Sequence, residues 1–332
     1  MNIENKRVLV TGAAGFIGSH LVEELVKRQC EVTAFVHYNS FNRWGWIDAL
    51  PLETKRQLNV LSGDITDAYG VKQALKGAEV VFHLAALIGI PYSYRSPEAY
   101  VDTNVKGTLN VLQAARELNT QRVVHTSTSE VYGTAQFVPI TEGHPVNPQS
   151  PYAATKAGAD FLALTFFRSF ETPVVVVRPF NTYGPRQSAR AIVPTIVSQI
   201  LSGSRRIMLG SVLPTRDLNY VKDTALAFVK AAESEKAVGE VINIGSDSEI
   251  SVGDLAAKIA GIIGTTVEIG QEEQRLRPAK SEVERLWAAN KKAADIIGWK
   301  PAWTLDKGLA ETIEWFREPG NLALYKPNIY NT

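Results

Sequence analysis

The chain has 332 residues, of which 45% are hydrophobic and 21% are charged, a composition typical of a soluble globular protein of about two domains. Its 35 basic and 34 acidic side chains leave a net charge of +1, which excludes a general attraction for nucleic acid or an anionic membrane. The single cysteine, Cys30, excludes an intrachain disulfide and a cysteine-based metal cluster.

Short β-branched segments alternate with longer helical patterns over the first 180 residues. The predicted strands cover 7–11, 31–36, 58–62, 80–83, 122–126 and 173–178. The predicted helices cover 16–28, 68–75, 97–118 and 150–170. This alternation predicts an α/β fold with a Rossmann-like, doubly wound parallel sheet. The valine-rich runs 8–10 and 174–177 fit strands that are buried on both faces.

Prolines and glycines divide the chain into shorter elements after residue 178. Helical patterns cover 221–232, 252–263, 290–297 and 305–316, and short strands are predicted at 206–209, 241–244 and 266–269. We therefore expect a nucleotide-binding domain over 1–180 and a smaller mixed α/β substrate domain over 181–320. The chain is free to cross back between them, and residues 321–332 are expected to form a loosely attached tail.

No feature of the sequence predicts export, membrane insertion or metal binding. The first eleven residues hold no apolar run long enough for a signal peptide, and the longest low-charge apolar stretch, 80–90, is too short to span a bilayer. The histidines and acidic residues show no metal-ligand spacing. We expect a cytoplasmic protein without a metal.

A glycine-rich turn follows the first predicted strand and opens the first predicted helix. Its sequence is Thr-Gly-Ala-Ala-Gly-Phe-Ile-Gly over 11–18. This spacing permits a tight turn, a close approach to a pyrophosphate and close helix–strand packing, while the helix N-terminus attracts phosphate. The candidate cofactor-binding residues here are Gly12, Ala14, Gly15, Phe16, Ile17 and Gly18.

The end of the second predicted strand lacks the carboxylate that usually binds the adenosine ribose of NAD. His37 stands there instead, and Arg43 follows shortly afterwards, so NADP is allowed and NAD is not specified. Asp64 and Ile65, after the third strand, are suited to contact the adenine edge, although Asp64 also fits a simple turn.

Tyr152 and Lys156 form a Tyr-x-x-x-Lys pair on a predicted helix, where an i,i+4 spacing puts both side chains on one face. A free tyrosine has a pKa of about 10, and a neighbouring ammonium group favours the phenolate. We therefore expect Lys156 to lower the pKa of Tyr152, so that this pair acts as a general base.

A second polar group, Ser-Thr-Ser-Glu-Val-Tyr-Gly over 127–133, lies just past the fifth strand, at the edge where open α/β sheets bind ligands. Thr128 can hydrogen-bond a substrate hydroxyl, and Glu130 can move a second proton. A simple oxidation does not need this second acid/base. We expect Tyr132 to serve packing, and His83 and His125 to be core histidines.

Together these residues resemble the extended short-chain dehydrogenase/reductase superfamily over almost the whole chain. Further marks are Arg-Pro-Phe-Asn-Thr-Tyr-Gly-Pro-Arg at 178–186, Arg-Asp-Leu-Asn-Tyr-Val-Lys-Asp at 216–223 and Asp-Thr-Asn-Val-Lys-Gly-Thr at 102–108. The resemblance implies bound NAD(P) that is recycled during turnover, and a nucleotide-diphosphate sugar as substrate. It adds as candidate cofactor-binding residues Leu84, Ala85, Ala86, Asn104 and Thr126, with Tyr152 and Lys156.

Within this superfamily the chain is similar to nucleotide-sugar 4,6-dehydratases. Thr128-Ser129-Glu130 looks like the triplet of GDP-mannose 4,6-dehydratases, whereas other hexose dehydratases carry Thr-Asp-Glu and simple 4-epimerases usually lack the glutamate. The run Tyr-Asn-Ser-Phe-Asn-Arg-Trp-Gly-Trp at 38–46 resembles the nucleotide-N-acetylglucosamine 4,6-dehydratases of legionaminic-acid-type pathways. The resemblance leaves open the nucleotide base, the C2 substituent and the stereochemistry at C5.

The resemblance implies roles for the site residues. Tyr152 takes the proton of the sugar 4-hydroxyl while hydride leaves C4, and Thr128 holds that oxygen. Glu130 then takes the C5 proton, and water leaves C6 with help from Ser129. Finally the hydride returns to C6. Arg216 and Arg277 are the candidates for binding the diphosphate. The other candidate substrate residues are Tyr92, Ser93, Asn181 and Arg186, the last of which could instead pair with a carboxylate.

Three alternative functions remain open. A 4-epimerase and a nucleotide-glucuronate decarboxylase share Tyr152, Lys156 and the removal of hydride from C4, and the decarboxylases also carry Thr-Ser-Glu-Val-Tyr-Gly. A non-catalytic sensor of the cofactor is a remote reading, because the catalytic residues are all present. By analogy with relatives, we expect a homodimer formed through helices 97–118 and 150–170.

Overall fold

A parallel sheet forms the centre of the computed structural model, which describes residues 1–327 and 329. Its seven strands lie in the order β11-β6-β5-β4-β1-β2-β3. They are β1 (Arg7–Thr11), β2 (Glu31–His37), β3 (Leu58–Gly63), β4 (Val80–His83), β5 (Arg122–Thr126), β6 (Val174–Pro179) and β11 (Val241–Ile244). Every neighbouring pair is parallel, which confirms the predicted doubly wound α/β fold.

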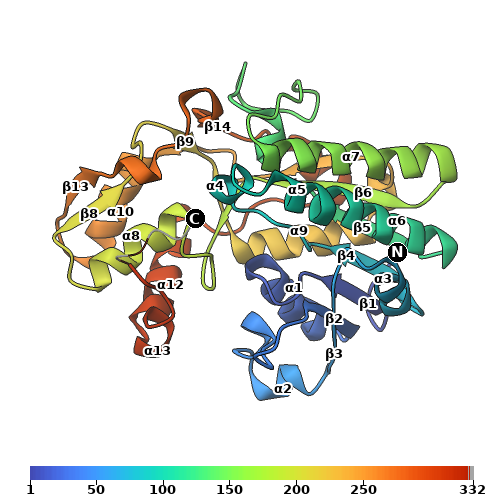
Figure 1. The fold of residues 1–332 in the computed structure, drawn as a ribbon. Helices are drawn as coiled ribbons and strands as arrows, with labels where there is room; N and C mark the ends of the chain where they lie inside the picture. The colour runs from blue at the N-terminus through green and yellow to red at the C-terminus, as the bar shows by residue number, and fades with distance from the viewer. Residues whose placement is uncertain (328, 330–332) are drawn as a thin grey trace.

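Helices cover both faces of this sheet (Figure 1). One face packs against α1 (Phe16–Lys27) and α9 (Val221–Glu233). The other packs against α3 (Ala68–Leu75), α6 (Gly107–Glu117) and α7 (Pro151–Phe170). Successive valines of β6 point to opposite faces and are buried on both, which explains why the strand reads as a continuous apolar run.

The chain returns to the large sheet after leaving it. The sequence interpretation grouped 221–232 and 241–244 with the smaller domain, but α9 packs beside α1 and β11 pairs with β6 at the sheet edge. The predicted helix 97–118 is also interrupted. It consists of α5 (Pro97–Tyr100), a π-helical turn η2 (Val101–Lys106) and α6.

The remaining elements form a smaller region around a second hydrophobic cluster. Its helices are α8 (Ile192–Leu201), α10 (Val252–Ile263) and α12 (Leu305–Arg317). Its strands are β7 (Asn181–Tyr183), β8 (Arg206–Leu209), β9 (Thr215–Arg216), β10 (Leu218–Tyr220), β12 (Ile250–Ser251), β13 (Glu268–Gln271) and β14 (Arg285–Leu286). Short helices elsewhere are α2 (Leu52–Lys55), α4 (Ile90–Ser93), α11 (Lys291–Ile297) and α13 (Pro319–Leu322).

The C-terminal segment is held more firmly than predicted. Tyr325 is buried, its ring lies 4.6 Å from that of Phe316, and its hydroxyl donates to the Gln187 carbonyl at 2.7 Å. The prediction of a loosely attached tail is therefore wrong for this part of 321–332, and residues 328 and 330–332 lie outside the described residues. Within residues 1–327 and 329, no helix has the length and apolar character needed to cross a bilayer.

Candidate active site

The glycine-rich turn at the end of β1 is shaped by its backbone. Gly12 has a φ of +69°, and a Cβ atom there would lie 2.7 Å from the Ala85 amide nitrogen. Gly15 is the N-cap of α1, and no side chain caps that helix. The first amide groups of α1 therefore remain available to a ligand at the carboxyl edge of the sheet.

Thr11 fixes the loop after β4 against this turn. Its hydroxyl oxygen accepts the backbone amides of Leu84 at 3.1 Å and Ala85 at 3.2 Å, so its proton points to His83 Nδ1 at 2.9 Å. His83 Nε2 then donates to Thr108 Oγ1 at 3.0 Å. Burial lowers the pKa of His83, which fits this neutral ring and the predicted core role.

The part of the site predicted to bind the adenosine is more exposed to solvent than the glycine-rich turn. His37 and Arg43 are exposed, and no carboxylate stands at the end of β2, as the sequence indicates. The Trp46 amide donates to the Ala14 carbonyl at 3.0 Å, so the segment after β2 lies against the glycine-rich turn. Asp64 closes a turn by accepting both the amide and the hydroxyl of Thr66 at 2.8 Å.

Three other candidate cofactor residues, Asn104, Ile65 and Thr126, lie largely inside the protein. Asn104 is fully buried, and its amide group bonds both the amide and carbonyl of Leu87 and the hydroxyl of Thr155. Ile65 is buried against α6. The Thr126 hydroxyl is buried and has no protein partner among the described residues. These side chains shape the walls of the predicted site.

These features fit a dinucleotide. The glycine cradle excludes a Cβ atom at Gly12, the uncapped end of α1 suits a pyrophosphate, and Leu84 and Ala85 are held beside them. Tyr152 and Lys156 lie on α7, on the far side of the same sheet edge, and both are buried. The geometry thus places the predicted cofactor loop and the catalytic helix at one edge.

The helix that carries the predicted catalytic pair, α7, begins with a side-chain cap. Ser150 Oγ accepts the Ala153 amide at 3.1 Å, and Pro151 occupies the first turn, where its missing amide proton is harmless. This start places Tyr152 in the first turn of α7 and Lys156 one turn later. Both side chains are thereby fixed relative to the end of β5.

The predicted acid/base groups meet at the beginning of α7. Thr128 Oγ1 accepts the Glu130 amide at 3.2 Å and thereby caps the 3₁₀ turn η3 (Ser129–Tyr132). Thr128 also hydrogen-bonds the Tyr152 side chain, and the charge of Glu130 acts on Tyr152. The structure therefore brings together the three residues for which the sequence predicted proton transfer or binding of the reacting oxygen.

The expected effect of Lys156 on Tyr152 is not found in the protein alone. Burial raises the pKa of Tyr152, the Thr128 hydrogen bond only partly offsets this, and Glu130 raises it further. Burial also lowers the pKa of Lys156 to about 8, with Asp160 acting in the opposite direction. The prediction failed because it counted the pairwise charge effect and omitted desolvation, which dominates at buried positions.

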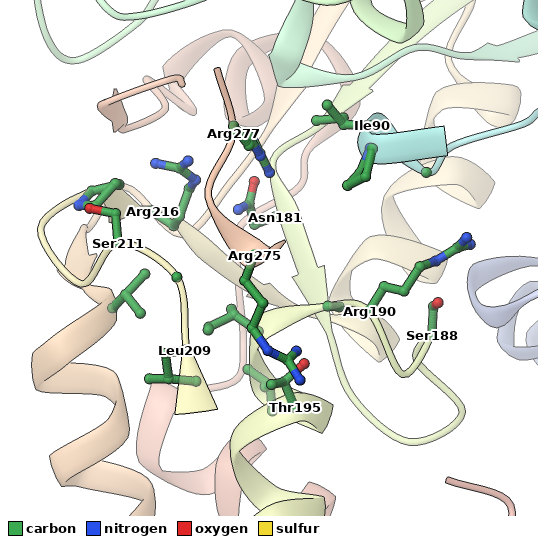
Figure 2. Close-up of a pocket in the computed structure, with 18 of the residues that line it drawn as sticks. Ile90, Asn181, Ser188, Arg190, Thr195, Leu209, Ser211, Arg216, Arg275 and Arg277 are labelled. Atoms are coloured by element: carbon green, nitrogen blue, oxygen red, sulfur yellow. The ribbon is translucent and has the colours of Figure 1, made fainter. Parts of the chain in front are cut away.

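A cavity of about 340 Å³ lies between the start of β7, α8 and the segment after β8 (Figure 2). It is lined by three predicted substrate residues, Asn181, Arg216 and Arg277. Arg190, Arg275 and Glu282 also line it and were missed by the sequence interpretation. Arg190 follows the Gly-Pro-Arg motif at 184–186, and Arg275 lies two residues before Arg277. This clustering of arginines in the sequence was the signal that could have identified them as lining residues.

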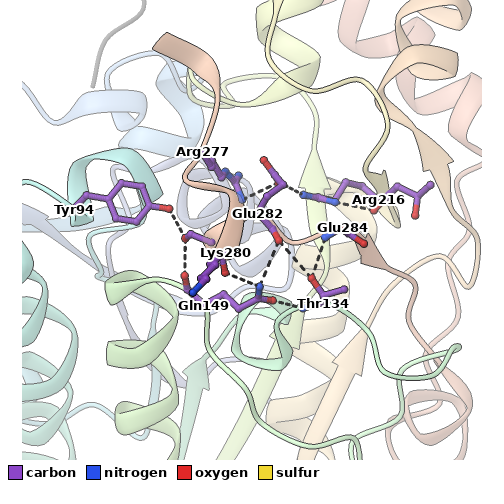
Figure 3. Close-up of polar contacts among 10 residues, drawn as sticks. Tyr94, Thr134, Gln149, Arg216, Arg277, Lys280, Glu282 and Glu284 are labelled. Carbon is purple, nitrogen blue, oxygen red and sulfur yellow. Dashed lines mark hydrogen bonds and ion pairs between the residues drawn. The ribbon is translucent and has the colours of Figure 1, made fainter. Parts of the chain in front are cut away.

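Arg216 and Arg277 converge on one carboxylate (Figure 3). Glu282 Oε1 lies 3.3 Å from Arg216 Nη2 and 3.7 Å from Arg277 Nη1. Burial lowers the pKa of Arg216, while the charges of Glu130 and Glu282 offset part of this effect. Arg216 therefore lines the cavity and also interacts electrostatically with Glu130, one of the predicted acid/base residues.

The segment 277–284 is tied to the catalytic region (Figure 3). Gln149, just before α7, donates to the Lys280 carbonyl at 3.0 Å. Ser281 Oγ lies 2.6 Å from the Tyr94 hydroxyl and donates to the Gln149 carbonyl at 2.5 Å. The arginine pair is thus connected to the start of the helix that carries Tyr152.

Three candidate substrate residues do not line the cavity. Arg186 is turned toward α1, where it donates to His20 Nδ1 at 2.7 Å and forms an ion pair with Glu23. This is the carboxylate pairing that the sequence left open. Ser93 is fully buried and donates to the Ile90 carbonyl at 2.7 Å. The ring of Tyr92 lies 6.1 Å from that of Tyr100, at a tilted angle.

A family model described as GDP-mannose 4,6 dehydratase matches residues 9–312. The chain belongs to this family. It lies within the short-chain dehydrogenase/reductase superfamily of nucleotide-sugar dehydratases and epimerases, as the sequence resemblance implied. Membership identifies the chain as an enzyme of this class.

Epimerases and dehydratases are both among the relatives that match this chain over nearly its whole length. A UDP-glucose 4-epimerase from Mycolicibacterium smegmatis is 34% identical over 94% of the chain and 98% of the relative. A dTDP-glucose 4,6-dehydratase from Streptomyces antibioticus is 34% identical over 96% and 94%. Dehydratases and epimerases therefore match at the same sequence identity.

Solved structures of similar fold likewise include both epimerases and dehydratases. A UDP-N-acetylglucosamine 4-epimerase from Methanobrevibacter ruminantium, in complex with UDP-N-acetylmuramic acid, has a TM-score of 0.84 and 32% identity over 94% of this chain and 98% of that chain. A dTDP-glucose 4,6-dehydratase from Streptomyces venezuelae, DesIV, solved with NAD, has a TM-score of 0.85 and 30% identity over 97% and 99%. The fold is shared closely with both.

Proposed function

We propose that the chain is an NAD(P)-dependent nucleotide-sugar 4,6-dehydratase that converts a UDP- or GDP-linked hexose, with N-acetylglucosamine as the sugar, into its 4-keto-6-deoxy product. The observation that carries this proposal is Glu130. It is only 9% exposed, sits on η3 directly after the Thr128 cap, and its charge acts on Tyr152. A second acid/base beside the tyrosine is what elimination of water needs and what simple C4 oxidation does not.

The glycine cradle, the end of α1 and the loop at Leu84 would hold the dinucleotide. Structures of relatives with bound NAD support NAD, and the exposed His37 and Arg43 leave NADP open. When bound, the oxidised nicotinamide would supply the hydride acceptor for C4. We propose that the cofactor stays bound, because the reaction has no net oxidation.

Tyr152 and Thr128 act on the sugar 4-hydroxyl. Thr128 holds the oxygen, and Tyr152 accepts its proton as C4 becomes a ketone. Because burial alone disfavours the phenolate, proton acceptance depends on nearby positive charge, and Lys156 supplies this charge one helical turn away. Lys156 is therefore required in its protonated form.

Glu130 and Ser129 act on C5 and C6. The 4-ketone acidifies the C5 proton, which Glu130 removes. The C5–C6 double bond forms as Glu130 passes that proton to the C6 hydroxyl, which leaves as water, and Ser129 is buried beside the carboxylate. Return of the hydride to C6 and of a proton to C5 completes the 4-keto-6-deoxy sugar.

The cavity beside these groups suits the diphosphate. Guanidinium groups bind phosphate through paired N–H donors, and Arg216, Arg277 and Asn181 face the same space. Figure 2 shows Arg190 projecting from the opposite wall. We assign Arg216 and Arg277 to the diphosphate, with Glu282 as their counter-ion before substrate binds.

A 4-epimerase is the second candidate, favoured by the epimerase relatives of equal identity. It would use Tyr152, Thr128 and Lys156 in the same way and return the hydride to the other face of C4. Glu130 would then have no step of its own. The two candidates therefore differ in the need for this carboxylate.

The deciding experiment incubates the pure protein with UDP-N-acetylglucosamine and, separately, with GDP-N-acetylglucosamine, without added reductant, and follows the mass of each product. We expect one of them to lose a single water. An unchanged mass with an altered NMR spectrum at C4 would instead establish epimerisation. Loss of carbon dioxide from a nucleotide glucuronate would establish a decarboxylase.

We further propose a homodimer formed through α6 and α7. Phe161 and Phe170 on α7 are 57% and 43% exposed, which is a large apolar area for a helix that carries catalytic residues. We expect light scattering at micromolar concentration to give the mass of two chains. A monomer under these conditions would contradict the proposal.

A further inference from the structure

A buried charge cluster lies beneath the catalytic residues and takes no part in the steps above. Its centre is Asp160 on α7, which is fully buried. Asp160 Oδ2 accepts Ser127 Oγ at 2.6 Å and Arg178 Nε at 3.0 Å, and Oδ1 lies 3.1 Å from His125 Nε2. These partners come from the ends of β5 and β6, so one carboxylate joins three elements.

The cluster continues to the turn that carries Glu130. Arg178 Nη1 donates to the Tyr132 hydroxyl at 2.9 Å, and that hydroxyl donates to Asn243 Oδ1 at 2.8 Å on β11. Tyr132 is the last residue of η3, and Ser127 immediately precedes Thr128. Both ends of the Thr128–Glu130 segment are therefore anchored, directly or through Arg178, to Asp160.

Asp160 is also placed to act on Lys156. The two residues are four apart on α7, so their side chains share a helix face. His83 on β4 and His125 on β5 face Lys156, and burial lowers the pKa of both, which keeps them neutral. Tyr152 is held as a phenol by burial.

Among the charged groups of this region, Asp160 acts on Lys156 from the same helix, Arg178 on β6 pairs with Asp160, and Glu130 on η3 acts on Tyr152. Asp160 is the charge that raises the pKa of Lys156 against the effect of burial. Arg178 is paired with Asp160 at 2.9 Å. The negative charge of Asp160 thus stabilises two cations, Arg178, which holds the strand ends, and Lys156, which is proposed to act in catalysis.

We propose that Asp160 is a positioning residue of the active site, which keeps Lys156 cationic and anchors the strand ends that carry Thr128 and Glu130. The inference rests on the proposed function for the role of Lys156, but the electrostatic contact does not depend on which reaction is catalysed. It assigns a function to a carboxylate that never touches substrate.

The test compares Asp160→Asn, Arg178→Gln and the double variant. Two quantities are measured, the pKa of the Lys156 amine by NMR of ¹⁵N-lysine-labelled protein and the pH profile of kcat. We expect Asp160→Asn to lower the pKa of Lys156 by about one unit and to move the alkaline limb of kcat to lower pH by a similar amount. The double variant should show the same decrease, and because it removes Arg178 together with its counter-ion, it leaves no buried guanidinium unpaired and guards against loss of the fold.

Arg178→Gln is the matched control, because it breaks the same cluster but keeps the carboxylate near Lys156. We expect the pKa of Lys156 in this variant to stay at or above that of the wild type. An unchanged pKa in both Asp160 variants, or an equal decrease in Arg178→Gln, would overturn the proposal. The NMR titration needs no turnover, so an absence of dehydratase activity would count against the proposed function alone.

Discussion

Replacement of Glu130 by glutamine is expected to slow loss of water by about 10²- to 10⁴-fold while leaving oxidation at C4 partly intact. The amide keeps the shape of the side chain but cannot accept the C5 proton. The backbone amide of Glu130 would still be held by Thr128, so the position of η3 should not change. Product mass and the absorbance of the reduced nicotinamide measure the two steps separately.

Glu282→Gln is a suitable control for this variant. It makes the same chemical change at another partly buried carboxylate of the site, one that contacts Arg216 and Arg277 rather than Tyr152. We expect it to alter KM with little effect on the ratio of oxidation to water loss. Full dehydratase activity in Glu130→Gln would refute the assigned role, and an undiminished epimerase activity would favour the second candidate.

Lys156→Met is expected to abolish activity and, at the same time, to stabilise the protein at neutral pH. The pKa of Lys156 is about 8 in the fold and 10.5 in a free side chain. At about 1.4 kcal/mol per pKa unit, burying the protonated amine costs about 3 kcal/mol of stability. Methionine fills similar space without a charge, so this cost would be removed while the cation needed by Tyr152 is lost.

The lowered pKa of Lys156 also predicts how the stability gain of Lys156→Met changes with pH. The fold disfavours the protonated amine, so the wild type bears the full cost below the folded pKa of about 8 and loses it as the pH rises toward 10.5. The gain of Lys156→Met in urea unfolding should therefore be largest at neutral pH and shrink at about pH 10. Lys236→Met, at an exposed lysine, should show no such gain. A less stable Lys156→Met protein at neutral pH would contradict the argument.

Local sequence patterns were enough to predict the parallel sheet and the cofactor turn. The valine-rich strands are buried on both faces, so their composition carries a strong signal, and the glycines of 12–18 are required by close backbone contacts that hardly depend on the rest of the chain. The Tyr152–Lys156 spacing likewise depends only on the helix. Such features are determined within one or two neighbouring elements.

Features that depend on partners distant in the sequence were either left open or predicted wrongly. Arg186 pairs with Glu23, more than 160 residues away, and β11 joins the large sheet after a long excursion through the smaller region. The direction of the Tyr152 pKa depends on burial by the whole site, which no spacing reveals. The pairing of Arg216 and Arg277 with Glu282 is also tertiary, although the clustered arginines were visible.

The position of Glu282 has a consequence for ligand selection. Because this carboxylate already neutralises part of the charge of Arg216 and Arg277, a diphosphate bound there as proposed would have to replace one anion by another. Binding is then an ion exchange rather than the capture of an anion by bare cations. A small inorganic anion gains little from such an exchange, whereas a nucleotide diphosphate also fills the neighbouring cavity. If Arg216 and Arg277 bind the diphosphate as proposed, we expect the built-in carboxylate to make the site discriminate against simple phosphates that two free arginines would retain.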